Sequence, residues 1–310
     1  MVWTVHKFGG TSVADAACVR RVAGIIAKEP DNLGVVVSAM KGVTDDLLGL
    51  VDRAARRESV DAQIKALRER HERSAVDLLG AAGAKPVLAQ FERELEDIQS
   101  ILKALSLVRS ASHRSRDLIS GFGEVWSARQ IAAFFKVEFA KTREVVFVDA
   151  RDVLVIDKGE MGPVVAWDAS RPRLNAVLPA GFKGIAVITG FVGSDRDGLP
   201  TTLGRNGSDY SASIFGALLD ATEVHIWTDV DGVMSGDPRR VPEAKIIDEM
   251  SYSEAMELAY FGAKVIHPQT MAPAVGRGIP IWIRNTFNAT HPGTKISAST
   301  SHRDAAVKGI

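Results

Sequence analysis

The sequence is nearly devoid of cysteine. Cys18 is the only one among 310 residues, and a single thiol can form neither an internal disulfide nor a cysteine-based metal site. A catalytic role for Cys18 is open, but the residue falls within an expected helix over 13–28, where a small packed side chain is the simpler interpretation. One thiol fits a reducing compartment, and we therefore expect a cytoplasmic protein.

Excess charge and long apolar runs are absent as well. Lysine and arginine together number 38, as do aspartate and glutamate, so the formal net charge is zero. Global electrostatics gives no reason to expect a nucleic-acid or anionic-membrane partner, and any anion-binding site must be local. The longest apolar runs, such as 35–37 and 185–188, are too short to cross a bilayer. Residues 1–7 lack the long apolar stretch of a signal peptide.

The remaining composition is that of a folded α/β protein. Hydrophobic residues make up 46% and charged residues 25% of the chain, which suffices for a substantial core, and the length fits two domains or one large unit. Short Val- and Ile-rich runs predict buried strands over 2–6, 35–38, 145–149, 185–189, 224–228 and 279–284. Helices are expected between them over 13–28, 44–57, 124–136, 209–220 and 252–260. Such alternation is typical of βαβ units.

One region breaks the alternation. Residues 60–107 show no strand, and two apolar stripes with steps of three and four residues predict two helices. The second stripe consists of Leu88, Phe91, Leu95, Ile98, Leu102 and Leu105. Residues 80–86, which contain glycine and proline, separate the stripes. We therefore expect a helical hairpin inserted into the α/β unit, with its stripe in the core or at a dimer contact.

The strongest local feature is the segment Lys7-Phe8-Gly9-Gly10-Thr11-Ser12, between the first expected strand and a helix. Glycines let backbone N–H groups approach a ligand, a helix N-terminus favours anions, and Lys7 adds a positive charge. These features predict a phosphate-binding loop, although a tight strand-to-helix turn explains them about as well. The spacing matches neither a Walker A loop nor the G-x-G-x-x-G dinucleotide fingerprint.

A second polar loop occupies residues 202–210, directly before an expected helix. An arginine in a glycine-rich loop, here Arg205, suits bidentate capture of a carboxylate or phosphate. Ser208 or Asp209 can instead be interpreted as the N-cap of the helix.

Two further segments carry candidate ligand-binding side chains. Residues 227–232, followed by 237–239, do not meet the ligand spacing of an EF-hand, and we interpret them as a loop at the carboxyl edge of a sheet, where α/β proteins bind nucleotides. In the segment 261–268, Lys264 is a second candidate phosphate-binding charge, whereas His267, next to a proline, is interpreted as structural.

Taken in order, these segments resemble the aspartokinase branch of the amino acid kinase family. The matching stretches are 7–13, 38–44, Gly123-Glu124, 203–210, 227–238 and 261–268. The resemblance runs from residue 4 to about residue 298, and its ordered set of motifs is far more specific than any single one. Residues 283–287 resemble the kinase half of aspartokinase–homoserine dehydrogenase fusions.

The resemblance implies a three-layer αβα sandwich around a mostly parallel sheet. It also implies transfer of the ATP γ-phosphoryl group to the side-chain carboxylate of L-aspartate. The product would be 4-phospho-L-aspartate, on the route to lysine, threonine and methionine. Mg²⁺ is implied as the partner of the phosphates, held largely by them, so no protein metal site is expected.

Residue by residue, the match implies specific roles. Lys7 corresponds to the catalytic lysine that contacts the transferring phosphoryl group, and Asp209 to the aspartate that organises the site. Arg205 corresponds to the residue that binds the substrate α-carboxylate and Glu124 to the one that binds its α-ammonium group. The rest of the substrate pocket is implied to comprise Thr44, Phe191 and Ser208.

The nucleotide site follows in the same way. Gly9 and Gly10 are implied to offer backbone N–H groups, and the other matching positions are Ser38, Thr228, Asp229, Asp237, Arg239 and Lys264. Two positions depart from the family pattern. Met234 stands where many relatives carry tyrosine, and Lys41 replaces a small residue. A methionine can still cover the face of an aromatic ring.

We expect residues 1–200, including the insertion over 60–107, to form an amino-acid-binding lobe, and 201–298 a nucleotide-binding lobe. Residues 299–310 resemble a linker towards a regulatory ACT domain, so a longer natural protein would continue into ACT and dehydrogenase domains. A homodimer that binds L-aspartate and ATP is expected, without a nucleic-acid or membrane partner.

Two alternatives stay open at this point. A glutamate-type acceptor differs from aspartate by one methylene, and the sequence does not measure pocket depth. An inactive regulatory module of the same fold is the other alternative, but it has no need for Lys7, Asp209, Arg205 and Glu124 together. A Rossmann oxidoreductase lacks its glycine fingerprint.

Overall fold

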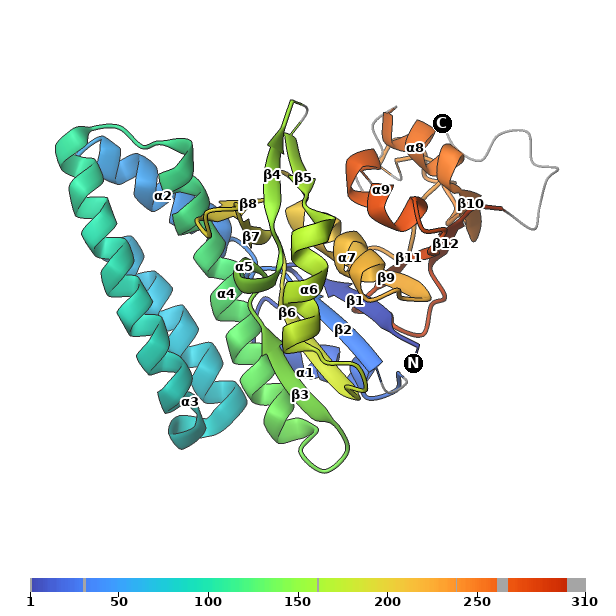
Figure 1. The fold of residues 1–310 in the computed structure, drawn as a ribbon, viewed down its shortest axis with the longest axis horizontal. Coiled ribbons are helices and arrows are strands. Elements are labelled where there is room, and N and C mark those ends of the chain that lie inside the picture. Colours follow the sequence, from blue (N-terminus) through green and yellow to red (C-terminus); the bar gives the residue numbers. More distant parts are fainter. Residues whose placement is uncertain (1, 30–31, 161, 238, 261–266, 300–310) are drawn as a thin grey trace.

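The computed structural model describes residues 2–29, 32–160, 162–237, 239–260 and 267–299. An eight-stranded sheet runs through this part of the chain in the order β10-β12-β11-β9-β1-β2-β6-β3 (Figure 1). Its strand pairs are parallel except for β11 with β12. The strands are β1 (Thr4–Phe8), β2 (Asn32–Val37), β3 (Glu144–Val148), β6 (Gly184–Thr189), β9 (Glu223–Thr228), β10 (Glu249–Ser251), β11 (Ile281–Asn285) and β12 (Thr294–Ser297).

Helices cover both faces of this sheet, because its central strands are apolar on both sides. On β2, Val36 packs into one hydrophobic core while Val35 and Val37 pack into the other. One core receives α1 (Ala16–Ile26) and α4 (His113–Glu138). The opposite core receives α6 (Trp167–Val177), α7 (Gly207–Leu218), α8 (Tyr252–Tyr260) and α9 (Pro268–Val275). The predicted three-layer αβα sandwich with a mostly parallel sheet is confirmed.

The inserted helical hairpin is also confirmed. It is the element α3 (Asp61–Val108), which bends at Gly80, where φ is 69° and ψ is 165°. Its two arms pack with α2 (Val43–Ala55) and α4 around a third core, and they lie beyond α4 at one side of the molecule (Figure 1). The break is confined to Gly80, because glycine tolerates this backbone conformation, and Pro86 lies within the second arm.

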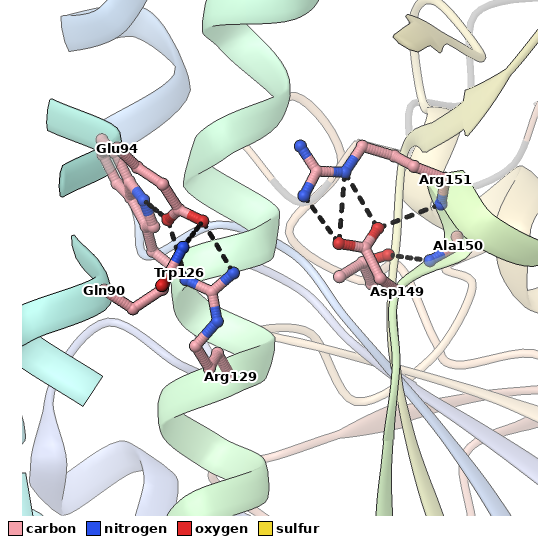
Figure 2. A network of polar contacts seen from close by, with 8 residues as sticks. Gln90, Glu94, Trp126, Arg129, Asp149, Ala150 and Arg151 are labelled. Carbon is pink, nitrogen blue, oxygen red and sulfur yellow. Dashed lines mark hydrogen bonds and ion pairs between the residues drawn. The ribbon is translucent and has the colours of Figure 1, made fainter. Parts of the chain in front are cut away.

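A buried ion pair fixes the hairpin to α4. The carboxylate of Glu94 accepts hydrogen bonds from both terminal nitrogens of Arg129, at 2.7 and 2.8 Å, and from Trp126 Nε1 at 2.8 Å. Figure 2 shows this cluster beside a second one, in which Arg151 pairs with Asp149. Such a fork-shaped arrangement is geometrically specific, so it sets how α3 sits on α4.

The six expected strands and five expected helices are all present, with two shifts that matter for function. The first strand ends at Phe8 and not at residue 6, so Lys7 is a strand residue. The helix expected over 124–136 begins at His113, capped by the Ser112 side chain, so Glu124 lies mid-helix.

Glycines explain why the early part of α4 was missed. Glycine lowers the helix propensity of a segment, so Gly121 and Gly123 obscured the helical pattern. In the fold, the same two glycines let α4 pack closely against neighbouring segments. A Cβ on Gly121 would lie 2.7 Å from Val192 Cγ1, and one on Gly123 would lie 2.9 Å from Ala39 Cβ.

The remaining elements, most of them short, were not expected from the sequence. They are α5 (Ala150–Val153), the hairpin of β4 (Ile156–Gly159) and β5 (Gly162–Val165), and the hairpin of β7 (Val192–Ser194) and β8 (Pro200–Thr202), besides β10, β12, α6 and α9. Over the ranges that the structure describes, no helix combines the length and apolarity needed to span a membrane.

Candidate active site

The carboxyl ends of four central strands meet at one edge of the sheet. Phe8, the last residue of β1, is in register with the ends of its neighbours β2 and β9. Three hydrogen bonds extend the ladder beyond the strand ends: Ser38 N–H to Phe8 O, Gly9 N–H to Trp227 O and Gly190 N–H to Val37 O, at 3.1, 3.2 and 2.9 Å. Open α/β sheets bind ligands at such an edge.

Lys7 and Asp209 form an ion pair at this edge. Lys7 lies near the end of β1 and is 8% exposed, and its Nζ is 2.5 Å from Asp209 Oδ1. Asp209 lies in the first turn of α7, whose N-cap is Asn206 with φ of 58°. The expectation that Ser208 or Asp209 caps this helix was therefore wrong. Asp209 instead places its carboxylate beside the buried ammonium group of Lys7.

Glu124 is a buried carboxyl group close to this pair. It is 4% exposed, and its Oε2 has no hydrogen-bond partner among the described residues. Burial raises its pKa to about 8, although the backbone N–H of Ala39 and the charge of Lys7 act in the opposite direction. A carboxyl group in this setting gains strongly from a cationic ligand, which restores its ionised form.

The glycine loop differs from the expectation in two respects. Helix α1 begins only at Ala16, and the carboxylate of Asp15 caps its first turn by accepting from Cys18 N–H. The N-terminus of α1 therefore already carries the Asp15 carboxylate and is not an open anion site. The N–H of Gly9 already donates to Trp227 O at the end of β9. A Cβ on Gly9 would lie at an ordinary contact distance, 3.5 Å, from Lys7 Nζ, so Gly9 lies directly beside the lysine.

Gly10 brings the loop against the segment after β2. Its carbonyl oxygen accepts from Lys41 N–H at 3.1 Å, and a Cβ on Gly10 would lie 3.0 Å from Ala39 O. Lys41 itself is exposed, while Ser38 is half-buried at the strand end. The close approach explains the glycine, because any side chain would push the two loops apart.

The loop after β6 brings two predicted substrate residues together. Phe191 has φ of 67°, in the left-handed region that costs a non-glycine residue conformational energy. Its N–H donates to Ser211 Oγ at 2.9 Å and its carbonyl oxygen accepts from Leu203 N–H at 2.8 Å. Ser208 lies beside the same loop, since a Cβ on Gly190 would be 2.9 Å from Ser208 Cβ. Ser211, which holds Phe191, was missed; the hydroxyl three residues after Ser208 was its only signal.

Arg205 and Thr44, two further predicted substrate residues, lie on a loop and in the first turn of a helix. Arg205 is exposed on the loop that joins β8 to α7, four positions before Asp209. Thr44 is half-buried in the first turn of α2. This helix end lies near Glu124, because a Cβ on Gly123 would be 3.2 Å from Val43 Cγ1.

The predicted nucleotide residues are only partly gathered. Thr228 ends β9, and its Oγ1 donates to Asp229 Oδ1 at 3.2 Å. Asp237 and Arg239 pair with each other at 2.8 Å on an exposed segment, and this pairing lowers the pKa of Asp237 to about 2. Lys264 lies outside the described residues.

Comparisons with known proteins show which family the chain resembles. The profile of the amino acid kinase family matches residues 2–285. The bifunctional aspartokinase/homoserine dehydrogenase 2, chloroplastic, of Arabidopsis thaliana is 40% identical over 95% of this chain and 32% of its own length. Aspartokinase 2, chloroplastic, of the same plant is 34% identical over 99% of this chain and 56% of its own length. The chain thus spans about a third to just over half of these relatives.

Solved structures of aspartokinases are also similar to this chain. E. coli aspartokinase III in complex with aspartate and ADP has a TM-score of 0.84 and 32% identity, covering 97% of this chain and 66% of that one. UMP kinase from Bacillus anthracis, at 14% identity and a TM-score of 0.51 over 96% of both chains, shares the fold alone. Because the family profile matches nearly its whole length, the chain belongs to the amino acid kinase family.

Proposed function

We propose that this chain is an aspartate kinase, which transfers the γ-phosphoryl group of ATP to the side-chain carboxylate of L-aspartate. The observation that carries the proposal is the buried Lys7–Asp209 pair close to a buried Glu124 whose Oε2 has no partner within the described structure. Relatives named as aspartokinases, and a similar structure whose protein binds aspartate and ADP, support it.

The reaction needs positioning more than proton transfer. A carboxylate acceptor is already ionised at neutral pH, so no general base is required. The protein must bring two anions together in line and stabilise the charge on the transferring group. We assign this stabilisation to Lys7, with Asp209 as the group that orients its ammonium. The loss of one preorganised donor of this kind costs roughly 10² to 10³ in turnover.

The protein would bind both the α-ammonium and the α-carboxylate group of the substrate. Glu124 would meet the α-ammonium group, which is the cation that its buried carboxyl lacks. Arg205, from the exposed loop before α7, would close on the α-carboxylate with its two parallel donors. The pocket would be completed by Thr44, Phe191 and Ser208, from the starts of α2 and α7 and the loop after β6.

The nucleotide would lie on the opposite side of Lys7. We assign to it the positions Gly9, Gly10, Ser38, Thr228, Asp229, Asp237, Arg239 and Lys264. No cluster of three or more histidine, cysteine or acidic residues suited to a metal occurs over the described ranges. We propose that Mg²⁺ would arrive on the nucleotide, with phosphate and water oxygens as ligands, and neutralise phosphate charge there.

Several wider features belong to the same proposal. They are an amino-acid-binding lobe over 1–200 and a nucleotide-binding lobe over 201–298, which would share the continuous sheet. We also propose a homodimer, a place in lysine and threonine biosynthesis, and a linker over 299–310 towards an ACT domain. The cytoplasmic location stays a prediction from the sequence, and the plant relatives carry the word chloroplastic in their names.

The test is ADP release by the purified chain with Mg-ATP and L-aspartate, L-glutamate or no acceptor. We expect turnover with aspartate that Lys7→Ala reduces to near background. Turnover with glutamate alone would keep the fold and overturn the substrate. ATP binding without turnover on any acceptor would contradict the proposed activity of this chain.

A further inference from the structure

A buried hydroxyl pair joins the glycine loop to the segment after β11. Ser12 Oγ and Thr286 Oγ1 lie 2.7 Å apart, and the two residues are 0% and 1% exposed. They come from opposite ends of the sequence, and neither has a role in the site described above. A buried hydroxyl group without a partner costs free energy, so each residue stabilises the other in this position.

Ser12 belongs to the loop that follows the catalytic lysine. Its N–H donates to Gly9 O at 2.9 Å, and the N–H of Gly9 donates in turn to Trp227 O at 3.2 Å. Gly9 is also the residue whose Cβ would lie 3.5 Å from Lys7 Nζ. A displacement of Ser12 would therefore shift Gly9, which lies next to the ammonium group of Lys7.

Thr286 belongs to a segment that holds the loop after β9. Its N–H donates to Thr228 O at 2.9 Å. The side-chain amides of Asn285 and Asn288 both donate to Asp231 Oδ1, at 2.7 and 3.1 Å. Residues 285–288 thus fix the loop 228–231, to which the nucleotide is assigned, through three hydrogen bonds.

These contacts close a ring: glycine loop, end of β9, segment after β11 and back to the glycine loop. We propose that Ser12 and Thr286 are a positioning pair that fixes the Lys7-bearing loop relative to the nucleotide-binding loop 228–231. In-line transfer depends on such alignment, because a small misplacement of the phosphates costs a large factor in rate. The inference rests on the proposed function, in which Lys7 acts in phosphoryl transfer and the loop 228–231 binds the nucleotide.

The test compares Ser12→Ala, Thr286→Val and the double variant. Loss of one hydrogen bond of this kind is expected to weaken Mg-ATP binding, measured by isothermal titration calorimetry, roughly 3- to 10-fold. We expect kcat to fall by a similar factor and the double variant to be no worse than either single one. Thr286→Ser retains the hydroxyl group and is expected to restore values near those of the unmodified chain.

Ser170→Ala is the matched control. Ser170 is also fully buried, and its Oγ bonds to Val155 N–H and Ala166 O, at 2.9 and 2.8 Å. It should lower the melting temperature without changing the dissociation constant of Mg-ATP, which separates a positioning role from a merely structural one.

Folded variants with unchanged Mg-ATP binding and kcat, or losses that add in the double variant, would overturn the inference. The calorimetric titration needs no acceptor. An unmodified chain that binds Mg-ATP but does not phosphorylate aspartate would therefore count against the proposed function, while the variants still decide on the pair. Absence of any nucleotide binding would overturn both.

Discussion

At the scale of single residues, two buried ionisable side chains at the sheet edge differ in whether they have an oppositely charged partner. Lys7 has its counter-ion, Asp209, at 2.5 Å. Glu124 has an oxygen without a partner in the described part of the chain, and burial raises its pKa to about 8. Lys7 is thus already paired with an opposite charge, whereas we expect Glu124 to lose a proton when a cation arrives.

Glu124 therefore predicts proton release on substrate binding. Below pH 8 the unliganded carboxyl group is mostly protonated, and an ammonium group requires the carboxylate, so binding should strengthen as pH rises from 6.5 towards 8 and level off above. Calorimetric titration of aspartate at pH 7 in two buffers of different ionisation enthalpy measures the released proton. Glu124→Gln should bind aspartate weakly and release none. An unmodified chain that binds aspartate with no proton released would refute this assignment.

Gly123, the neighbour of Glu124, determines how closely α4 approaches the carboxyl edge of the sheet. Gly123→Ala would place its Cβ 2.9 Å from Ala39 Cβ, so α4 must move and both stability and aspartate affinity should fall. Gly24→Ala in α1 is the matched control. No atom lies within 4 Å of its added Cβ, and we expect a gain of about 0.5–1 kcal/mol. Equal effects of the two substitutions on the KM for aspartate would contradict this account.

At the scale of elements, the α3 hairpin depends on one buried carboxylate. Glu94 receives Arg129 and Trp126 of α4 (Figure 2), and its removal leaves the arginine charge without a partner. Glu94→Ala should therefore lower the free energy of unfolding by about 3–5 kcal/mol, measured by urea denaturation.

The exposed pair of Lys65 with Glu69, on the same element, is the comparison. Its atoms are 3.8 Å apart and both side chains are more than half exposed, so Glu69→Ala should change stability by less than about 1 kcal/mol. Similar losses in the two variants would show that the buried network does not fix the hairpin.

Element prediction succeeded where periodicity is strong and failed where tertiary contacts decide. The apolar stripe from Leu88 to Leu105 specified an arm of α3, and the Val- and Ile-rich runs specified six strands. The first turns of α4 were missed because Gly121 and Gly123 suit packing against Val192 and Ala39, which a single segment cannot reveal. Short hairpins such as β7–β8 carry too few residues for any period to appear.

At the scale of the whole molecule, motifs far apart in sequence meet because parallel strands end at one edge. The resemblance implied Lys7 and Asp209 as site residues, and the structure pairs the two side chains at 2.5 Å; their roles in the reaction stay predictions. Contacts such as Phe191 with Ser211, or Ser12 with Thr286, were not predictable, since each depends on the packing of separate loops. The raised pKa of Glu124 likewise arises from its burial in the fold and not from its motif.

The most direct test of the central claim is detection of the product in the presence of hydroxylamine, which converts an acyl phosphate into a stable hydroxamate. With Mg-ATP and L-aspartate, the account predicts the side-chain hydroxamate of aspartate in proportion to the ADP formed. Lys7→Ala should lower both by a factor of roughly 10² to 10³. ADP release without hydroxamate, or hydroxamate formation that survives in Lys7→Ala, would contradict phosphoryl transfer to the aspartate carboxylate at this site.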